Sequence, residues 1–202
     1  MELYLIRHTT PAVAKGICYG QTDLDVTETF ETEVASIRPH LPENIKVVYS
    51  SPLQRCRKLA EALFPDHTLQ LHSDLMELDC GTWEMQEWNK IPKTEMQPWL
   101  DDFIHVVVPE GESYLQMHER VVNRFEEIAN QTHPAVIVAH GGVLRSILAH
   151  ITSTSLKQSF DVFTCHYGSV VKLVKHNNQF QHEMLYNVSL EGKEWHRPDR
   201  EG

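Results

Sequence analysis

Arg7, His8, Arg55 and His140 are the residues of this chain whose types are suited to phosphoryl transfer. Hydrolysis of a phosphate ester without a metal requires a nucleophile, positive charge around the phosphoryl oxygens and an acid for the leaving alkoxide. A neutral imidazole at His8 could attack phosphorus while the planar guanidinium of Arg7 contacts the phosphoryl oxygens. Taken alone, an Arg-His pair has almost no specificity and is more often a buried structural histidine beside an exposed arginine.

Arg55 and His140 stand at places where an anion is expected to bind. Arg55 follows Ser-Ser-Pro-Leu-Gln at the start of a predicted helix, and helix N-termini favour anions. The nearby Arg57 and Lys58 are expected to face solvent. His140 precedes two glycines whose backbone can approach an oxyanion closely. We expect its imidazole to be held as a cation that completes a phosphate cradle.

The proton donor should be a carboxyl group near this cradle. The candidates are Glu77, Asp79, Glu84 and Glu87, which lie close together in the chain. Glu77 stands between two apolar residues, so we expect partial burial to raise its pKa and to favour proton donation. This reasoning does not separate Glu77 from Glu84.

The elements that must position these residues form an alternating pattern of strands and helices. Leu3–Ile6, Lys46–Tyr49 and Ala135–Ala139 are apolar runs typical of buried strands, and each is followed by one of the polar clusters above. This alternation predicts a three-layer α/β sandwich with a mostly parallel central sheet flanked by helices. Ligands bind such sheets beyond the carboxyl ends of the strands, where the three clusters would meet.

The rest of the chain supplies further helices, a hairpin and an irregular middle segment. A first helix is predicted after an N-cap at Thr27, with an apolar face of Phe30, Val34 and Ile37 and an end at Pro39, and a second has the apolar face Leu53, Cys56, Ala60 and Leu63. Residues 75–108 are predicted to form an excursion with one or two short helices, followed by helices over Ser113–Asn130 and Val143–His150. Two strands, Ser169–Val174 and Phe180–Leu185, are predicted to form a hairpin joined by Asn177-Asn178.

Composition excludes several classes of protein. The chain has 202 residues, a net charge of −10 and no basic run, which argues against nucleic-acid binding. No apolar run approaches the roughly 20 residues that span a bilayer, so we expect a soluble cytoplasmic protein without membrane partners. The four cysteines are spaced as free thiols rather than as a zinc site. We expect one domain over residues 1–190 and a polar tail over 191–202, which could include residues left by cloning.

Six motifs in order resemble the histidine phosphatase superfamily, also called phosphoglycerate mutase-like. They are Leu-Ile-Arg-His-Thr, Tyr-Gly-Gln-Thr-Asp, Ser-Ser-Pro-Leu-Gln-Arg, Met-Glu-Leu-Asp-Cys-Gly-Thr-Trp-Glu, Gly-Glu-Ser and Val-Ala-His-Gly-Gly-Val, between residue 3 and about residue 147. The resemblance implies a metal-independent phosphomonoesterase of the histidine acid phosphatase type, without a cofactor, acting on a small phosphorylated metabolite. It makes His8 the phosphorylated nucleophile and Glu77 the proton donor.

The resemblance also assigns the phosphate pocket and its surroundings. Arg7, Arg55 and His140 would form the pocket, with the backbone of Gly141 beside them. Thr9 departs from the glycine that usually follows Arg-His, and its hydroxyl would narrow the entrance.

Within the superfamily, the segment Lys15–Asp23 and Trp83-Glu84-Met85 are similar to the α-ribazole phosphatases of cobalamin nucleotide-loop assembly. Tyr19, Gln21 and the tryptophans between residues 83 and 99 would then form a platform for the base of the substrate, or the tryptophans would be core residues. The alternatives are a phosphatase of broad specificity, a phosphoglycerate mutase and a non-catalytic phosphate-binding module.

Overall fold

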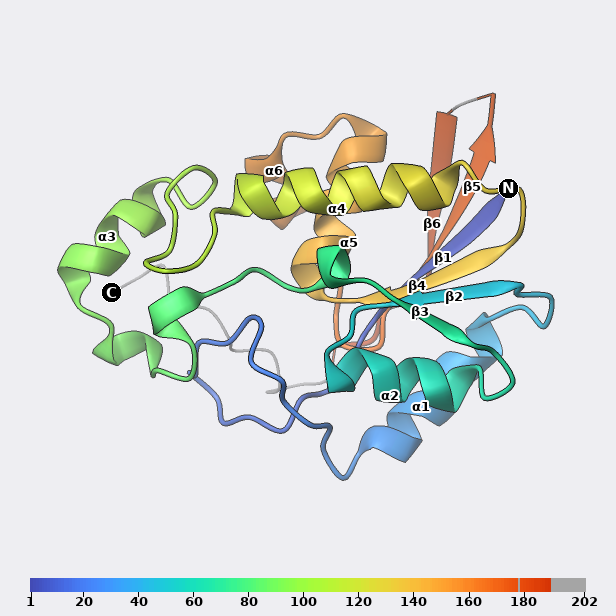
Figure 1. The fold of residues 1–202 in the computed structure, drawn as a ribbon, viewed down its shortest axis with the longest axis horizontal. Coiled ribbons are helices and arrows are strands. Elements are labelled where there is room, and N and C mark those ends of the chain that lie inside the picture. Colours follow the sequence, from blue (N-terminus) through green and yellow to red (C-terminus); the bar gives the residue numbers. More distant parts are fainter. Residues whose placement is uncertain (178, 190–202) are drawn as a thin grey trace.

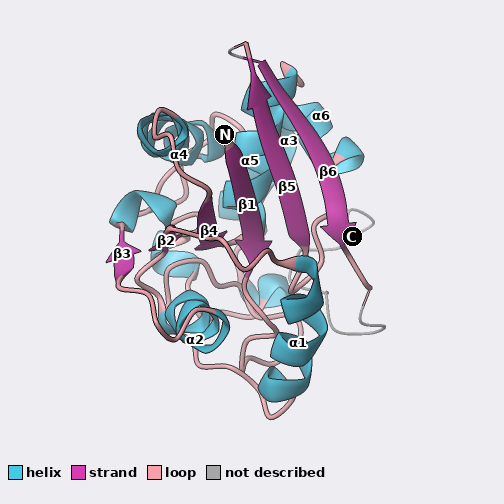
Figure 2. Cartoon of the chain, turned by 90° about the vertical axis from the view of Figure 1, so that its right-hand side faces the viewer, coloured by secondary structure: helices cyan, strands magenta, loops and turns pink. Residues whose placement is uncertain are grey.

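The computed structural model describes residues 1–177 and 179–189, and its centre is a six-stranded sheet. The strand order is β3-β2-β4-β1-β5-β6, which the labels in Figure 2 follow from left to right. β1, β2, β3 and β4 run parallel, whereas β5 runs antiparallel to β1 and β6 runs antiparallel to β5. The strands are β1 (Glu2–Arg7), β2 (Val47–Ser50), β3 (Leu69–Leu71), β4 (Ala135–Ala139), β5 (Val170–His176) and β6 (Gln179–Tyr186).

Helices cover both faces of this sheet, so the predicted three-layer α/β sandwich is confirmed. The α-helices are α1 (Phe30–Ile37), α2 (Gln54–Leu63), α3 (Lys93–Asp101), α4 (Tyr114–Ala129), α5 (Gly141–Thr152) and α6 (Leu156–Val162). In Figure 1, α1 and α2 lie on one side of the sheet, and α4, α5 and α6 lie on the other. α3 lies away from the sheet, beyond the end of α4.

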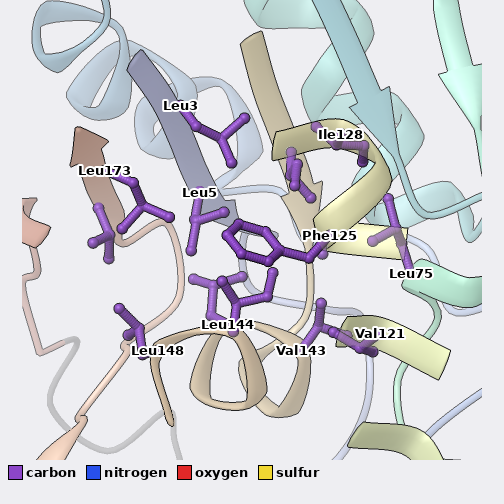
Figure 3. Close-up of a cluster of buried hydrophobic side chains, with 14 of the residues drawn as sticks. Leu3, Leu5, Leu75, Val121, Phe125, Ile128, Val143, Leu144, Leu148 and Leu173 are labelled. Atoms are coloured by element: carbon purple, nitrogen blue, oxygen red, sulfur yellow. The ribbon is translucent and has the colours of Figure 1, made fainter. Parts of the chain in front are cut away.

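Alternation along the strands divides the core between the two faces, because successive side chains of a strand point in opposite directions. In β1, Leu3 and Leu5 pack with α4 and α5, while Tyr4 and Ile6 pack with α1 and α2. Figure 3 shows the side chains of Leu5, Phe125 and Leu144 pointing toward one another in the larger cluster. Both faces of the central strands are therefore buried, which explains their continuous apolar runs.

The long helix α4 begins where the sequence indicates. Ser113 is its N-cap: the Ser113 side chain accepts a hydrogen bond from the Gln116 N–H, and the Gln116 side chain accepts one from the Ser113 N–H. This reciprocal capping satisfies two backbone donors that a helix start leaves unpaired. The apolar face, which includes Met117, Val121 and Phe125, is buried as its spacing predicts.

Several predicted boundaries are wrong by a few residues. α1 is capped at Thr29 rather than Thr27, whose carbonyl accepts the Phe30 N–H in a preceding turn. α5 begins at Gly141, because the helix includes both glycines rather than starting at Val143. The hairpin strands extend beyond their predicted bounds to His176 and Tyr186, and Asn178 of the predicted turn lies outside the described residues.

Two short elements are not anticipated from the sequence. β3 has three residues at the sheet edge, two of them exposed, so it carries no apolar run. α6 has one buried residue, Ser159, and therefore lacks an apolar stripe. Its start is nonetheless marked by the Ser155 side chain, which accepts the Gln158 N–H.

The middle segment forms a separate small cluster beyond the sheet. It contains single turns of 3-10 helix at Ser73–Leu75, Gly81–Trp83 and Trp88–Lys90, followed by α3. Trp83, Trp88, Ile91 and Val108 pack with two cysteines in this cluster. No helix among residues 1–177 and 179–189 is long and apolar enough to cross a membrane. The predicted tail, residues 191–202, lies outside the described residues.

Candidate active site at the carboxyl ends of the strands

Strand register brings the two histidines together. β1 and β2 both pair in parallel with β4, with Arg7 opposite Ala139 and Ser50 opposite Val138. His8 and His140 therefore leave adjacent strands at the same edge of the sheet. Their ring centroids are 5.1 Å apart, although 132 positions of chain separate Arg7 from Ala139. The predicted convergence of the two imidazoles is present in the structure.

His8 is 2% exposed, and one hydrogen bond defines its tautomer. Its Nδ1 lies 2.7 Å from the carbonyl oxygen of Thr9. Because a carbonyl oxygen can only accept, Nδ1 carries the proton, and in a neutral ring the lone pair is on Nε2. This tautomer suits nucleophilic attack through Nε2.

Arg55 is a completely buried cation that lies among backbone carbonyls. Its two terminal nitrogens donate to the carbonyls of Thr22 at 2.8 Å and Gly20 at 2.6 Å. Its Nε is buried without a hydrogen-bond partner among the described residues, and no carboxylate of those residues forms an ion pair with the guanidinium. A desolvated guanidinium that lacks a counter-ion favours binding of an anion. Arg57 and Lys58, one turn along, pair with exposed carboxylates, as predicted for surface residues.

Arg7 reaches the N-terminus of α5, where Gly141 begins the helix. Its Cζ lies 4.0 Å from the centre of the Tyr167 ring, and its side chain donates to the carbonyl of Cys165. A Cβ placed on Gly141 would lie 3.1 Å from the Arg7 Nε, closer than a side chain tolerates without a shift of its neighbours. Glycine at position 141 is therefore what permits the guanidinium and the helix start to come so close.

His140 is also fully buried, and this corrects its expected charge. Its Nε2 lies 2.8 Å from the Ser51 hydroxyl and 3.4 Å from the Cys56 sulfur. Burial, followed by the positive charge of Arg55, holds the pKa of His140 well below its usual range. The prediction that His140 is a standing cation is wrong for this protein without its substrate. An arriving anion would offset the positive charge of Arg55 and favour protonation.

Glu77 lies at the same helix start. Its carboxylate accepts the Gly142 N–H at 3.0 Å and the Leu78 N–H at 3.1 Å. A Cβ on Gly142 would come within 2.2 Å of the Glu77 Oε1, so only glycine allows the carboxyl group to sit there. Glu77 is half-buried, and its carboxyl group lies beside Gly142, two residues after His140. A proton donor at this position could reach a leaving group bound between the histidines.

The other three candidate carboxyl groups form hydrogen bonds or ion pairs away from the two histidines. Glu84 accepts the backbone N–H groups of Gly20, Gln21, Thr22 and Cys80 together with the Thr22 hydroxyl. Asp79 accepts the Gly81 N–H, and Glu87 forms an exposed ion pair with Lys90. Glu84 thus closes the loop whose carbonyls Arg55 holds, which is a structural role. These contacts favour Glu77 over Glu84 as the candidate proton donor.

Replacement of Glu84 by Gln should therefore affect stability first. We expect Glu84→Gln to lower the free energy of unfolding by about 2 kcal/mol, because charge-assisted hydrogen bonds to several backbone donors weaken together. Urea denaturation measures the change, and Glu87→Gln, which breaks only a surface ion pair, should cost less than about 0.5 kcal/mol. Equal stability of the two variants would contradict the structural role of Glu84.

Thr9, Tyr19 and Gln21 all surround the site, with different freedom to contact a ligand. The Thr9 hydroxyl is buried beside His8 and has no partner among the described residues. The Tyr19 hydroxyl is 2.8 Å from that of Tyr167, and burial raises the pKa of Tyr19 well above its usual value. The Gln21 side-chain amide donates to the Glu77 carbonyl at 3.1 Å. Thr9 thus keeps a hydroxyl for a ligand, whereas Gln21 orients the segment that carries Glu77.

The tryptophan platform is not supported by the structure. Trp83 and Trp88 are 1% and 9% exposed and pack against each other in the small cluster. Trp99 stacks on Trp88 and is half-buried. The alternative that these tryptophans are core residues is confirmed for Trp83 and Trp88.

Tyr167 is a site residue that the sequence analysis missed. Its ring lies 5.4 Å from that of His8 and beneath Arg7. Tyr167 precedes β5, which is antiparallel to β1, so the start of β5 lies beside the end of β1. A hydrogen bond from the Gly168 N–H to the His8 carbonyl joins the two strand ends. The terminal hairpin predicts only that β5 and β6 are antiparallel to each other, so the approach of Tyr167 to His8 depends on the pairing of β5 with β1.

Comparisons with known proteins agree with this arrangement. The chain is 29% identical over 167 residues to the metal-independent phosphoserine phosphatase of Arabidopsis thaliana, covering 76% of this chain and 70% of that protein. The crystal structure of the α-ribazole phosphatase from Shigella flexneri superposes with a TM-score of 0.83 at 21% identity, covering 91% and 95% of the two chains. A phosphoserine phosphatase from Entamoeba histolytica, solved with 3-phosphoglyceric acid, gives a TM-score of 0.75 at 17% identity, covering 94% and 98%.

The structural superpositions show a shared fold, whereas a family model compares the sequence itself, including the site motifs. The model of the histidine phosphatase superfamily (branch 1) matches residues 3–188, a span that includes every site residue described above. Since the match extends over nearly the whole sequence, this protein belongs to the histidine phosphatase superfamily, branch 1.

Proposed function

We propose that this phosphatase hydrolyses phosphomonoesters through a transient phosphohistidine on His8, without a metal ion. The observation that carries the proposal is the cluster itself: two imidazoles 5.1 Å apart, with the buried Arg55 beside them and a carboxyl group at the start of α5. The Nδ1–H···O=C bond of His8 leaves Nε2 as the nucleophilic nitrogen. Positive charge from side chains takes the part that a metal would play around the phosphoryl oxygens.

The reaction has two steps. In the first, His8 Nε2 attacks phosphorus in line, a P–N bond forms, the P–O ester bond breaks, and the Glu77 carboxyl group gives its proton to the leaving oxygen. In the second, the Glu77 carboxylate takes a proton from water, whose oxygen attacks phosphorus. The P–N bond breaks, inorganic phosphate leaves, and the lone pair returns to Nε2.

The cradle holds the phosphoryl group during both steps. Arg7 and Arg55 both lie close enough to His140 to lower its pKa, and α5 begins beside Arg7 at Gly141, where a helix N-terminus favours an anion. His140, neutral while the site is empty of anions, would take up a proton as phosphate binds and then donate to a phosphoryl oxygen. The Thr9 hydroxyl supplies a further donor beside His8.

We propose a small phosphorylated metabolite as substrate. The similarity of Lys15–Asp23 to α-ribazole phosphatases makes α-ribazole 5′-phosphate one candidate, although burial of Trp83 and Trp88 removes its expected base platform. The 29% identity to a metal-independent phosphoserine phosphatase makes phosphoserine a second candidate. A phosphatase of broad specificity would accept both.

Phosphate release in the presence of EDTA tests this function. The panel contains an aryl phosphate, α-ribazole 5′-phosphate, phosphoserine, nucleoside monophosphates, sugar phosphates and 3-phosphoglycerate. We expect turnover of the aryl phosphate that EDTA does not reduce. Rapid positional exchange of labelled phosphoglycerate without phosphate release would indicate a mutase instead, and no turnover of any compound would indicate a phosphate-binding module.

A further inference from the structure

Two tyrosine rings lie against the two arginines of the phosphate cradle. The Arg7 Cζ is 4.0 Å from the centre of the Tyr167 ring, and the Arg55 Cζ is 5.5 Å from the centre of the Tyr19 ring. The hydroxyl groups of the two tyrosines are 2.8 Å apart, although 148 positions of chain separate them. Because an aromatic face attracts a guanidinium, the bond between the hydroxyls links the supports of two positive charges.

Each arginine is held twice by one short segment. Arg55 donates to the carbonyl of Gly20, the residue after Tyr19, at 2.6 Å. Arg7 donates to the carbonyl of the residue two positions before Tyr167. A carbonyl and a ring from the same segment fix both the position and the direction of a guanidinium. A shift of either segment would therefore move its arginine.

The two segments are anchored to different parts of the protein. The segment of Tyr167 is fixed to the end of β1, because the Gly168 N–H donates to the His8 carbonyl, and the rings of Tyr167 and His8 lie 5.4 Å apart. Tyr19 lies in the loop between β1 and α1, and the backbone of the preceding Cys18 pairs with the middle segment rather than with the sheet. The hydroxyl bond therefore ties this loop to the strand end that carries the nucleophile.

The Tyr19 hydroxyl is protonated and lies near both arginines. Burial raises the pKa of Tyr19 well above its usual value, and the positive charges of Arg7 and Arg55 oppose this shift without reversing it. Since both charges act on the hydroxyl, it lies within reach of both guanidinium groups. A neutral phenol at this place supports the arginines without a negative charge, so their charge stays available to a phosphoryl group.

We infer that Tyr19 and Tyr167 form one positioning pair, which sets the distance and direction between the two cradle arginines. This inference rests on the proposed phosphatase function and adds two residues that act through the arginines. In phosphoryl transfer, charge spreads over three equatorial oxygens of the transition state, and a small misplacement of the groups that stabilise it lowers the rate. The pair should therefore affect kcat more than substrate binding.

Removal of the hydroxyl groups, singly and together, tests the pair. We expect Tyr19→Phe and Tyr167→Phe each to lower kcat on an aryl phosphate roughly 5–10-fold, with KM changed less than about twofold, because the rings remain while the bond between the hydroxyls is lost. The double variant should lose no more than one single variant, because both changes remove the same bond. Inhibition by orthovanadate, which can adopt the five-coordinate geometry of the transition state, should weaken in parallel with kcat, and inhibition by phosphate should change less.

Tyr4→Phe is the matched control, because Tyr4 is a buried tyrosine whose hydroxyl donates to Glu2, at the end of β1 away from His8. It should leave kcat and vanadate inhibition unchanged, and thermal unfolding checks that every variant is folded. Tyr19→Phe and Tyr167→Phe variants that behave like Tyr4→Phe would overturn the inference, as would losses that multiply in the double variant, since each tyrosine would then act separately.

Labelling of the wild-type protein separates this inference from the proposed function. Phosphate label on wild-type His8 together with unchanged rates in both single variants would remove only the positioning pair. A wild-type protein that neither takes up label nor hydrolyses the aryl phosphate would remove both proposals.

Discussion

Replacing His8 by Ala is expected to reduce phosphate release by about 10⁴-fold or more while the protein stays folded. The variant lacks the nitrogen that forms the P–N bond, and loss of a nucleophile removes the covalent route entirely. The His8 ring donates to the carbonyl of the adjacent Thr9, and the backbone bonds of residue 8 to Ala139 and Gly168 remain in the variant, so the sheet and the helices should stay intact. Initial rates with an aryl phosphate and thermal unfolding monitored by circular dichroism measure the two effects.

A label experiment links this loss to the intermediate. Wild-type protein quenched in alkali during turnover of a ³²P-labelled substrate should carry acid-labile label, and His8→Ala should carry none. His105→Ala is the control, since His105 is an exposed histidine that pairs with Asp102. Near-normal activity of His8→Ala, or label that persists in it, would contradict the mechanism.

Replacing Glu77 by Gln should slow hydrolysis of alkyl phosphates by about 10²–10⁴-fold, the usual contribution of a positioned general acid. The amide cannot give a proton to the leaving alkoxide or take one from water. Its carbonyl oxygen can still accept the Gly142 N–H, so the start of α5 keeps a partner. Steady-state rates with phosphoserine and with p-nitrophenyl phosphate measure the effect.

The leaving group distinguishes proton transfer from a structural role. p-Nitrophenolate is stable as an anion, so formation of its phosphohistidine should depend much less on Glu77, and a burst of nitrophenol should remain in Glu77→Gln. Glu87→Gln, which alters an exposed carboxylate, should match the wild-type protein with both substrates. Equal slowing of the burst and of alkyl-ester hydrolysis would mean that Glu77 positions α5 rather than transferring protons.

Local signals in the sequence were strong where an element is regular and buried. The run Ala135–Ala139 predicts β4 with its observed bounds, and the amphipathic pattern over Ser113–Asn130 predicts α4 to within one residue at each end. Apolar runs that end in Arg7-His8 and in His140 were sufficient to predict their meeting, because parallel strands have their carboxyl ends at one edge. β3 and α6 escaped prediction because each buries too little apolar surface to leave a periodic pattern.

Local patterns in the sequence predicted the architecture and the set of residues at the strand ends, because hydrophobic periodicity and turn chemistry act over a few residues. The charge of His140, the structural use of Glu84, the burial of Trp83 and the approach of Tyr167 to the cradle emerge only in the folded protein. Each of these depends on groups that are distant in the chain. Desolvation and pairing arise from the surroundings that folding assembles, so residue types and spacing alone do not contain them.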